Sequence, residues 1–141
     1  MVPSHLREES SYRHWVTVTI RYSDQDPVGH VNNAVYVTWI EACRVSYIAP
    51  FLPEVGDLDF VLANMQVDFL KETRFPGEVQ VGGRIERLGN TSIHTAWGVF
   101  QDTNCLAVAR CVNVFFDTRI RRPTPPPPDA RERLLAEIPG P

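Results

Sequence analysis

Residues 34–49 read AVYVTWIEACRVSYIA and decide the fold. The stretch contains neither glycine nor proline, and Asn32 or Asn33 can cap its amino end. Its large apolar side chains recur at helical spacing: Tyr36, Trp39, Ile40, Cys43 and Tyr47. The β-branched run 35–40 alone would also suit a strand, but about 17 residues suit a helix of about 26 Å. The sequence predicts one long helix that is apolar nearly all round and therefore buried on most sides.

Alternating segments on both sides of this helix predict strands. The period-2 pattern of residues 15–22 places four side chains on the inward face: Val16, Val18, Ile20 and Tyr22. Four more alternating segments follow the helix, separated by turn residues: 63–69, 79–85, 93–100 and 106–116. Within the second of these, Gly82 and Gly83 predict a bulge. The sequence thus predicts an α+β fold in the order β-α-β-β-β-β, with a five-stranded antiparallel sheet wrapped around one long central helix.

The length and composition fit a single domain. The 141 residues are 43% hydrophobic and 22% charged, close to the averages for soluble globular proteins, which excludes a disordered or fibrous chain. We expect an N-terminal extension over residues 1–13 and the domain itself over 14–122. Residues 123–141 are expected to form a proline-rich linker and a short C-terminal helix.

The charge and the apolar pattern exclude several classes of protein. A net charge of −3 argues against binding to nucleic acid through its phosphates, which requires an excess of lysine and arginine. No apolar run approaches the ~20 residues that span a bilayer, and residues 1–14 lack the apolar stretch of a signal peptide. The spacing of the three cysteines fits neither a redox pair nor a zinc site. We therefore expect a cytoplasmic protein with reduced thiols and with no nucleic-acid or membrane partner.

The segment before the helix, residues 23–30, combines turn residues with Asp24, Asp26 and His30. A helix start offers unpaired N–H groups and a positive dipole end, which favour an acceptor that develops negative charge. An ionised carboxylate nearby can attack an activated carbonyl or take a proton from water. Acyl transfer is therefore one interpretation of this segment. The other is that the aspartates only cap the helix or form a local turn, and that His30 only makes hydrogen bonds within the loop.

Residues 21–36 read RYSDQDPVGHVNNAVY and resemble the opening motif of the 4-hydroxybenzoyl-CoA thioesterase group of hot-dog fold enzymes. The Asp-x-Asp-Pro-x-Gly part is similar to the hydroxybenzoyl-CoA branch. The His-Val-Asn-Asn part is similar to short bacterial acyl-CoA thioesterases and to plant acyl-ACP thioesterases. The resemblance covers residues 14–121, because the element order expected from the residues is also the hot-dog order.

The resemblance implies a role for each residue that matches the motif. Asp26 matches the family's catalytic carboxylate, which acts as nucleophile or as general base on water. Asn33 matches the helix-start position whose backbone N–H polarises the thioester carbonyl. His30 matches the catalytic histidine of the acyl-ACP branch, which carries an asparagine where this chain has Val28. Gly29 matches the residue that lets the loop approach the substrate, and we expect Val28 and Gly29 to contact that substrate.

Further substrate contacts are expected outside the motif. Glu41 falls on the helix where relatives carry an acid, and its alternative role is an exposed residue paired with Arg44. A second set resembles a segment that relatives place near the CoA nucleotide, and would otherwise be a solvated hairpin tip: Arg87, Asn90, Thr91 and Ser92. Three aromatic side chains are expected in the core rather than in an acyl pocket: Trp39, Phe69 and Trp97.

The resemblance implies an acyl-CoA thioesterase that uses neither a cofactor nor a metal ion. Its expected partner is an acyl-CoA or acyl carrier protein thioester, and it is expected to form a homodimer or homotetramer with its sites at the subunit boundary. Two other functions stay open. A hot-dog hydratase or dehydratase shares the fold but uses an Asp-x-Asn-Pro-x-His pattern, from which residues 24–30 depart. A non-catalytic acyl-thioester-binding module would use Asp26 only as a cap.

Overall fold

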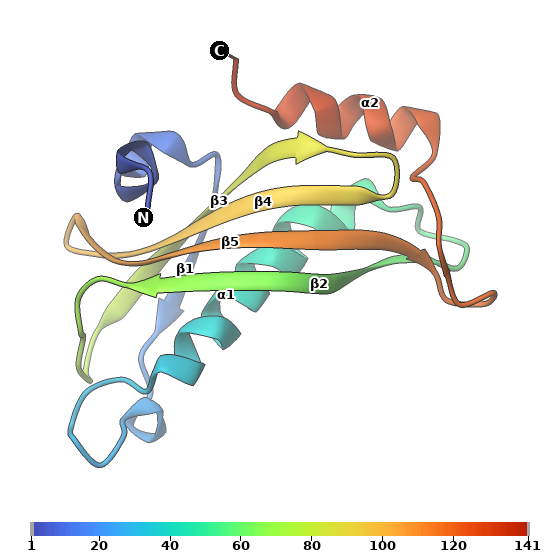
Figure 1. Cartoon of the computed structure of the whole chain (residues 1–141). Coiled ribbons are helices and arrows are strands. Elements are labelled where there is room, and N and C mark those ends of the chain that lie inside the picture. Colours follow the sequence, from blue (N-terminus) through green and yellow to red (C-terminus); the bar gives the residue numbers. More distant parts are fainter. Residues whose placement is uncertain (1, 141) are drawn as a thin grey trace.

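The computed structural model describes residues 2–140 and shows one curled sheet with a long helix against its face (Figure 1). The strands and helices run in the order β1 (His14–Thr19), α1 (Asn33–Ile48), β2 (Leu58–Phe69), β3 (Glu78–Leu88), β4 (Ser92–Gln101), β5 (Asn104–Asp117), β6 (Arg122–Pro123) and α2 (Pro128–Glu137).

The sheet order is β1-β3-β4-β5-β2, and every neighbouring pair is antiparallel. The short strand β6 adds to the end of β5. Strands β3, β4 and β5 follow one another through tight turns, whereas β1 and β2 flank α1 in the chain and form the two edges. The predicted α+β fold, an antiparallel sheet of five main strands around one long helix, is confirmed.

Helix α1 forms where the sequence predicts it, with Asn32 as the N-cap. The Asn32 side chain accepts a hydrogen bond from the Ala34 N–H at 2.9 Å. The buried face includes all five predicted apolar positions and Ile48: Tyr36, Trp39, Ile40, Cys43, Tyr47 and Ile48. The prediction that α1 is buried on most sides is wrong for this chain. The helix packs mainly on β1, β3 and β4, and Val45 on its outer face is 47% exposed.

Gly82 and Gly83 in β3 leave room for aromatic rings and do not mark a bulge. The predicted bulge at Gly82 and Gly83 is wrong, because both residues pair in register and the shift comes between Ile85 and Arg87. A Cβ on Gly83 would lie 2.3 Å from Trp97 Cζ3. Glycine is therefore required at this position because of close packing and not because of backbone conformation.

Two strand boundaries also differ from the prediction. Strand β1 ends at Thr19, and Tyr22 belongs to a 3-10 turn that leaves its ring exposed rather than facing inward. Strand β2 begins at Leu58, several residues before the predicted start. The pairing of β2 with β5 shifts between Leu62 and Asn64, so the side chains that face inward change from one set of alternate positions to the other. A single period-2 pattern therefore does not detect the first half of the strand.

Segments near both ends of the described residues 2–140 pack onto this domain. Near the N-terminus, residues 2–12 cover the sheet face opposite α1 and form a second apolar cluster: Val2, Leu6, Tyr12, Ala96, Phe100 and Val108. The predicted C-terminal helix is present as α2, and its Leu134 is fully buried in the same core as α1. The Tyr47 hydroxyl of α1 donates to Glu137 Oε1 at 2.8 Å, which joins the two helices.

Among the residues described, no helix is both long enough and apolar enough to cross a membrane. The cysteines are free thiols, as predicted, with Cys43 and Cys111 buried and Cys105 partly exposed. Burial raises the pKa of Cys43 to about 12 and that of Cys111 to about 11, so both thiols stay protonated at neutral pH.

Candidate active site

The connection between β1 and α1, residues 20–32, is called the Asp26 loop below. Asp24 holds its first half, since its buried carboxylate accepts hydrogen bonds from the Arg21 backbone N–H at 2.7 Å and from the Arg21 guanidinium at 2.8 and 3.0 Å. The Asp24 carbonyl also accepts from the Asn32 N–H at 2.9 Å. Asp24 is therefore fully engaged within the loop and has a structural role.

Asp26 lies in a tight turn that uses one of its two carboxylate oxygens. Oδ1 accepts hydrogen bonds from the Val28 N–H at 2.9 Å and from the Gly29 N–H at 3.2 Å. Gly29 has a φ of +94°, a left-handed conformation that glycine adopts at little cost. The Asp26 side chain is 19% exposed, and its Oδ2 faces the His30 ring. The second oxygen is thus the one that remains for chemistry or for substrate.

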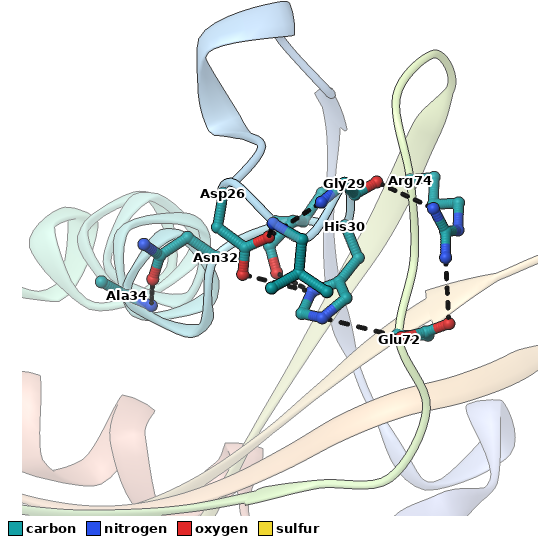
Figure 2. Close-up of polar contacts among 9 residues, drawn as sticks. Asp26, Gly29, His30, Asn32, Ala34, Glu72 and Arg74 are labelled. Atoms are coloured by element: carbon teal, nitrogen blue, oxygen red, sulfur yellow. Dashed lines mark hydrogen bonds and ion pairs between the residues drawn. The ribbon is translucent and has the colours of Figure 1, made fainter.

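His30 lies between two carboxylates. Its Nδ1 is 3.5 Å from Asp26 Oδ2 and 3.3 Å from the Val31 carbonyl oxygen, and its Nε2 is 3.7 Å from Glu72 Oε2 (Figure 2). In the tautomer with its hydrogen on Nδ1, the ring can donate to either of the two acceptors beside this nitrogen. The structure therefore brings Asp26 and His30 together and adds Glu72 from a distant part of the chain.

The amino end of α1 leaves one backbone donor unoccupied. The Asn32 cap satisfies Ala34, and the Val35 N–H donates to the Asn32 carbonyl at 2.9 Å. The Asn33 N–H has no acceptor in residues 2–140. Figure 2 shows Asp26 beside this end of the helix. A free amide at a positive dipole end can donate a hydrogen bond to an oxygen that develops negative charge, which is the property the prediction assigned to Asn33.

Two clefts flank the Asp26 loop. One, of about 160 Å³, is lined by His30, Val31, Asn33, Tyr36, Phe69, Leu70, Lys71 and Glu72. The other, a more open recess of about 610 Å³, is lined by Tyr22, Ser23, Gln25, Asp26, Pro27 and Gly29. The candidate histidine and Asn33 line the first of these clefts. The candidate carboxylate and the glycine line the other.

Aromatic side chains form one wall of the smaller cleft. Phe69 is 43% exposed as a residue and its ring packs edge-on against Tyr36 with centroids 5.4 Å apart, so the prediction of a core position for Phe69 is wrong. Trp39 and Trp97 are buried as predicted. Burial raises the pKa of Tyr36, which keeps its phenol neutral.

The structure places the remaining predicted residues away from this loop. Glu41 lies about 12 Å along α1 from Asn33 by helical rise, is exposed, and has a carboxylate oxygen 4.0 Å from an Arg44 nitrogen. The Arg44 guanidinium donates to Asn113 Oδ1 at 3.1 Å. A role for Glu41 in substrate binding stays a prediction.

The hairpin between β3 and β4 carries the residues predicted to bind the CoA nucleotide: Arg87, Asn90, Thr91 and Ser92. Figure 1 shows this hairpin beside α2, at the opposite end of α1 from the Asp26 loop. Arg87 lines a polar recess of about 350 Å³, and its Nη2 donates to His94 Nε2 at 3.0 Å. Burial and the nearby Arg87 charge lower the pKa of His94. Nucleotide binding at this hairpin stays a prediction.

Glu72 and Arg74 border the site and were not predicted from the sequence. They lie in the connection between β2 and β3, about 40 residues beyond the Asp26 loop. No local motif marks them, because their place depends on how the chain returns after β2. In residues 2–140 no group of three or more His, Cys, Asp or Glu side chains is arranged to hold a metal ion.

A curled antiparallel sheet around one long helix, with a carboxylate loop at the amino end of that helix, defines the hot-dog class of proteins. The sequence model of the Thioesterase-like superfamily matches residues 20–134. The chain therefore belongs to the Thioesterase-like superfamily.

Solved structures agree with this assignment. A predicted thioesterase from Bacillus stearothermophilus is 32% identical, with a TM-score of 0.82 over 91% of this chain and 98% of that one. A thioesterase from Thermus thermophilus, complexed with coenzyme A and Zn, is 35% identical, with a TM-score of 0.78 over 87% and 98%. The PA5185 protein of Pseudomonas aeruginosa strain PAO1 is 27% identical, with a TM-score of 0.84 over 93% and 95%.

Among curated proteins, the uncharacterised protein YsmA of Bacillus subtilis (strain 168) is 25% identical over 87 residues. That match spans 60% of this chain and 59% of YsmA. The family and the solved structures together indicate a thioester hydrolase.

Proposed function

We propose that the protein is an acyl-CoA thioesterase of the 4-hydroxybenzoyl-CoA thioesterase group, with Asp26 as nucleophile or general base. One observation carries the proposal: the Asp26 carboxylate accepts backbone hydrogen bonds at Oδ1 and turns Oδ2 toward His30, in the loop that leads into a helix amide with no acceptor in residues 2–140. The assignment to the 4-hydroxybenzoyl-CoA thioesterase group rests on the Asp-x-Asp-Pro-x-Gly pattern of residues 24–29.

The site supports hydrolysis in either of two ways. In the first, Asp26 Oδ2 attacks the thioester carbonyl, the C–S bond breaks, coenzyme A leaves as a thiolate, and water hydrolyses the resulting anhydride. In the second, Asp26 takes a proton from water as that water attacks the carbonyl, and the thiolate leaves from the tetrahedral intermediate. In both, the Asn33 N–H stabilises the negative carbonyl oxygen. His30 holds Oδ2 in place through its Nδ1.

A coenzyme A ester is the proposed substrate because the similar thioesterase from Thermus thermophilus is complexed with coenzyme A. Arg87 and the neighbouring hairpin supply a positive charge and polar side chains that suit the phosphates of a nucleotide. Within one chain this hairpin lies at the far end of α1 from the Asp26 loop. A homodimer or homotetramer with sites at the subunit boundary would let the hairpin of one chain serve the loop of another.

The proposal is tested by following free thiol release from short, long and aryl acyl-CoAs. Asp26→Asn is expected to lower kcat/KM at least about 100-fold, the usual loss for a general base or nucleophile. His30→Ala is expected to lower it less. Asp102→Asn is the matched control, because Asp102 lies in the exposed β4–β5 turn with a φ of 49°, which asparagine also tolerates. An unchanged rate in Asp26→Asn would remove Asp26 from the mechanism.

A single turnover in ¹⁸O-labelled water separates the two mechanisms. Label found in the Asp26 carboxylate identifies attack by Asp26, because it enters when water opens the anhydride at the Asp26 carbonyl, whereas water that attacks the thioester directly leaves all of the label in the released acid.

A non-catalytic acyl-thioester-binding module is the second candidate, favoured by the turn in which Asp26 Oδ1 accepts two backbone hydrogen bonds. It predicts acyl-CoA binding without thiol release in the wild-type protein. Hydration of a 2-enoyl-CoA without thiol release would instead identify a hydratase.

A further inference from the structure

The connection between β2 and β3, residues 70–77, lies alongside the Asp26 loop and is bonded to it. The Val31 N–H donates to the Thr73 carbonyl at 2.8 Å. The Tyr22 and Phe75 rings pack edge-on with centroids 5.7 Å apart. These contacts fix the two ends of the Asp26 loop to this connection and leave its central turn to be held by polar groups.

Polar contacts around the central turn form a closed ring. The Arg74 Nη1 donates to the Gly29 carbonyl at 3.1 Å, and its Nη2 lies 3.5 Å from Glu72 Oε1. Glu72 Oε2 lies 3.7 Å from His30 Nε2, and His30 Nδ1 lies 3.5 Å from Asp26 Oδ2. Asp26 Oδ1 accepts from the Gly29 N–H, which returns to the start (Figure 2).

The central turn has no apolar anchor of its own. Val28 is 73% exposed, and Gly29 has no side chain. A Cβ on Gly29 would lie 3.3 Å from Arg74 Nη1, so the guanidinium fits against the bare glycine. Within this ring, Arg74 contacts both the Gly29 carbonyl in the turn and the Glu72 carboxylate, which lies beside His30 Nε2.

We propose that Arg74 is a positioning residue for the proposed thioesterase. Its guanidinium holds the Gly29 carbonyl and, through Glu72, the orientation of the His30 ring. Together these contacts keep Asp26 beside the amino end of α1. The expected effect of Arg74 on the reaction rate rests on the proposed function. Its expected effect on the conformation of the Asp26 loop does not.

Arginine suits this role because its planar fork can donate to two acceptors at once, whereas a lysine ammonium on a flexible stem holds them less rigidly. A small displacement of a catalytic group has a large effect on rate, since misplacement by about 1 Å can cost up to about 100-fold. Arg74 itself is 60% exposed, so its replacement is not expected to unfold the protein.

The first test compares Arg74→Ala and Arg74→Lys with Arg119→Ala in the full-length protein. Arg119 is a matched control because it is 77% exposed and lies 3.7 Å from Asp57, in the loop after β5. Arg74→Ala is expected to lower kcat about 10-fold with KM changed less than about twofold. Arg74→Lys is expected to recover part of that loss, and Arg119→Ala is expected to match the wild type.

A truncated substrate separates positioning from substrate binding. An exposed arginine that bound a phosphate of coenzyme A would raise KM for the acyl-CoA and leave hydrolysis of the acyl-N-acetylcysteamine thioester unchanged. A positioning residue lowers kcat for both substrates alike. The proposal would be overturned if Arg74→Ala raised KM for the acyl-CoA and left hydrolysis of the truncated thioester unchanged, or if it left kcat unchanged.

The second test needs no activity. Backbone amide hydrogen exchange at Val28 and Gly29, both donors to Asp26, is expected to be at least about 5-fold faster in Arg74→Ala than in Arg119→Ala. Equal exchange in the two variants would refute the positioning role. If the wild-type protein released no thiol from any acyl-CoA, the proposed function would fail while this measurement still decided the role of Arg74.

Discussion

Replacing Asn33 with proline removes the backbone hydrogen on which the proposed chemistry depends. Asn33 is the first residue of α1, a position where proline is favoured because no helical hydrogen bond is lost and φ is already suitable. The preceding residue, Asn32, has φ −63° and ψ 137°, which is the extended conformation that proline requires before it. The substitution therefore deletes one N–H and leaves the helix intact.

The expected magnitude follows from the number of donors at this end of α1. The N–H groups of Ala34 and Val35 are already bonded to Asn32, so the Asn33 N–H is the unoccupied donor of the first turn. Loss of a single oxyanion donor costs about 2.7–4 kcal/mol, or about 100- to 1000-fold in kcat. Asn33→Ala keeps the N–H and is expected to retain kcat within about threefold.

The assay is thiol release from the best acyl-CoA, measured together with urea unfolding. Asn33→Pro is expected to lose kcat while its free energy of unfolding stays within about 0.5 kcal/mol of the wild type. Comparison with Asn33→Ala removes any contribution of the amide side chain. A proline variant that folds normally and hydrolyses the substrate at the wild-type rate would refute the assignment of the oxyanion donor.

Two further predictions concern stability. Gly83→Ala places a Cβ 2.3 Å from the Trp97 ring and is expected to lower the free energy of unfolding in urea by about 1–3 kcal/mol, the usual cost of overpacking; an unchanged midpoint would contradict the close packing of β3. Burial and the Arg87 charge lower the pKa of His94, so the unfolded chain takes up this proton first as the pH falls. The wild-type free energy of unfolding is therefore expected to decrease between about pH 7.5 and 5.5, and His94→Gln is expected to decrease less over the same range. Parallel curves for the two proteins would show that His94 does not contribute.

Local patterns predicted the elements whose environment is regular. Helix α1 could be predicted because its segment contains neither glycine nor proline and carries apolar side chains at helical spacing. Strands β3, β4 and β5 could be predicted because their successive side chains point to opposite faces of the sheet, both of which are packed. The failures lie where the environment is irregular: the exposed Tyr22 ends an alternating run, and the irregularity before Asn64 reverses the alternation within β2. The glycines of β3 mark contacts with rings on other elements, which no local pattern reveals.

For the site, the loop motif predicted Asp26, His30 and Asn33 as candidates; the structure brings Asp26 and His30 into contact in one loop, and Asn33 follows as the first residue of α1. Their contacts are local, and a short tight turn has few conformations. The sequence alone therefore determined the candidate carboxylate, the candidate histidine and the helix amide.

Only the tertiary structure decided what surrounds them. Glu72 and Arg74 reach the Asp26 loop because the chain leaves the edge strand β2 and turns back toward β3 at the end of the sheet where α1 begins. That contact depends on the length of β2 and its pairing with β5, which are properties of the whole sheet. Side chains about 40 residues apart meet only when the packing of every intervening element is settled, because long-range contacts are set by the summed packing free energy and not by local preference.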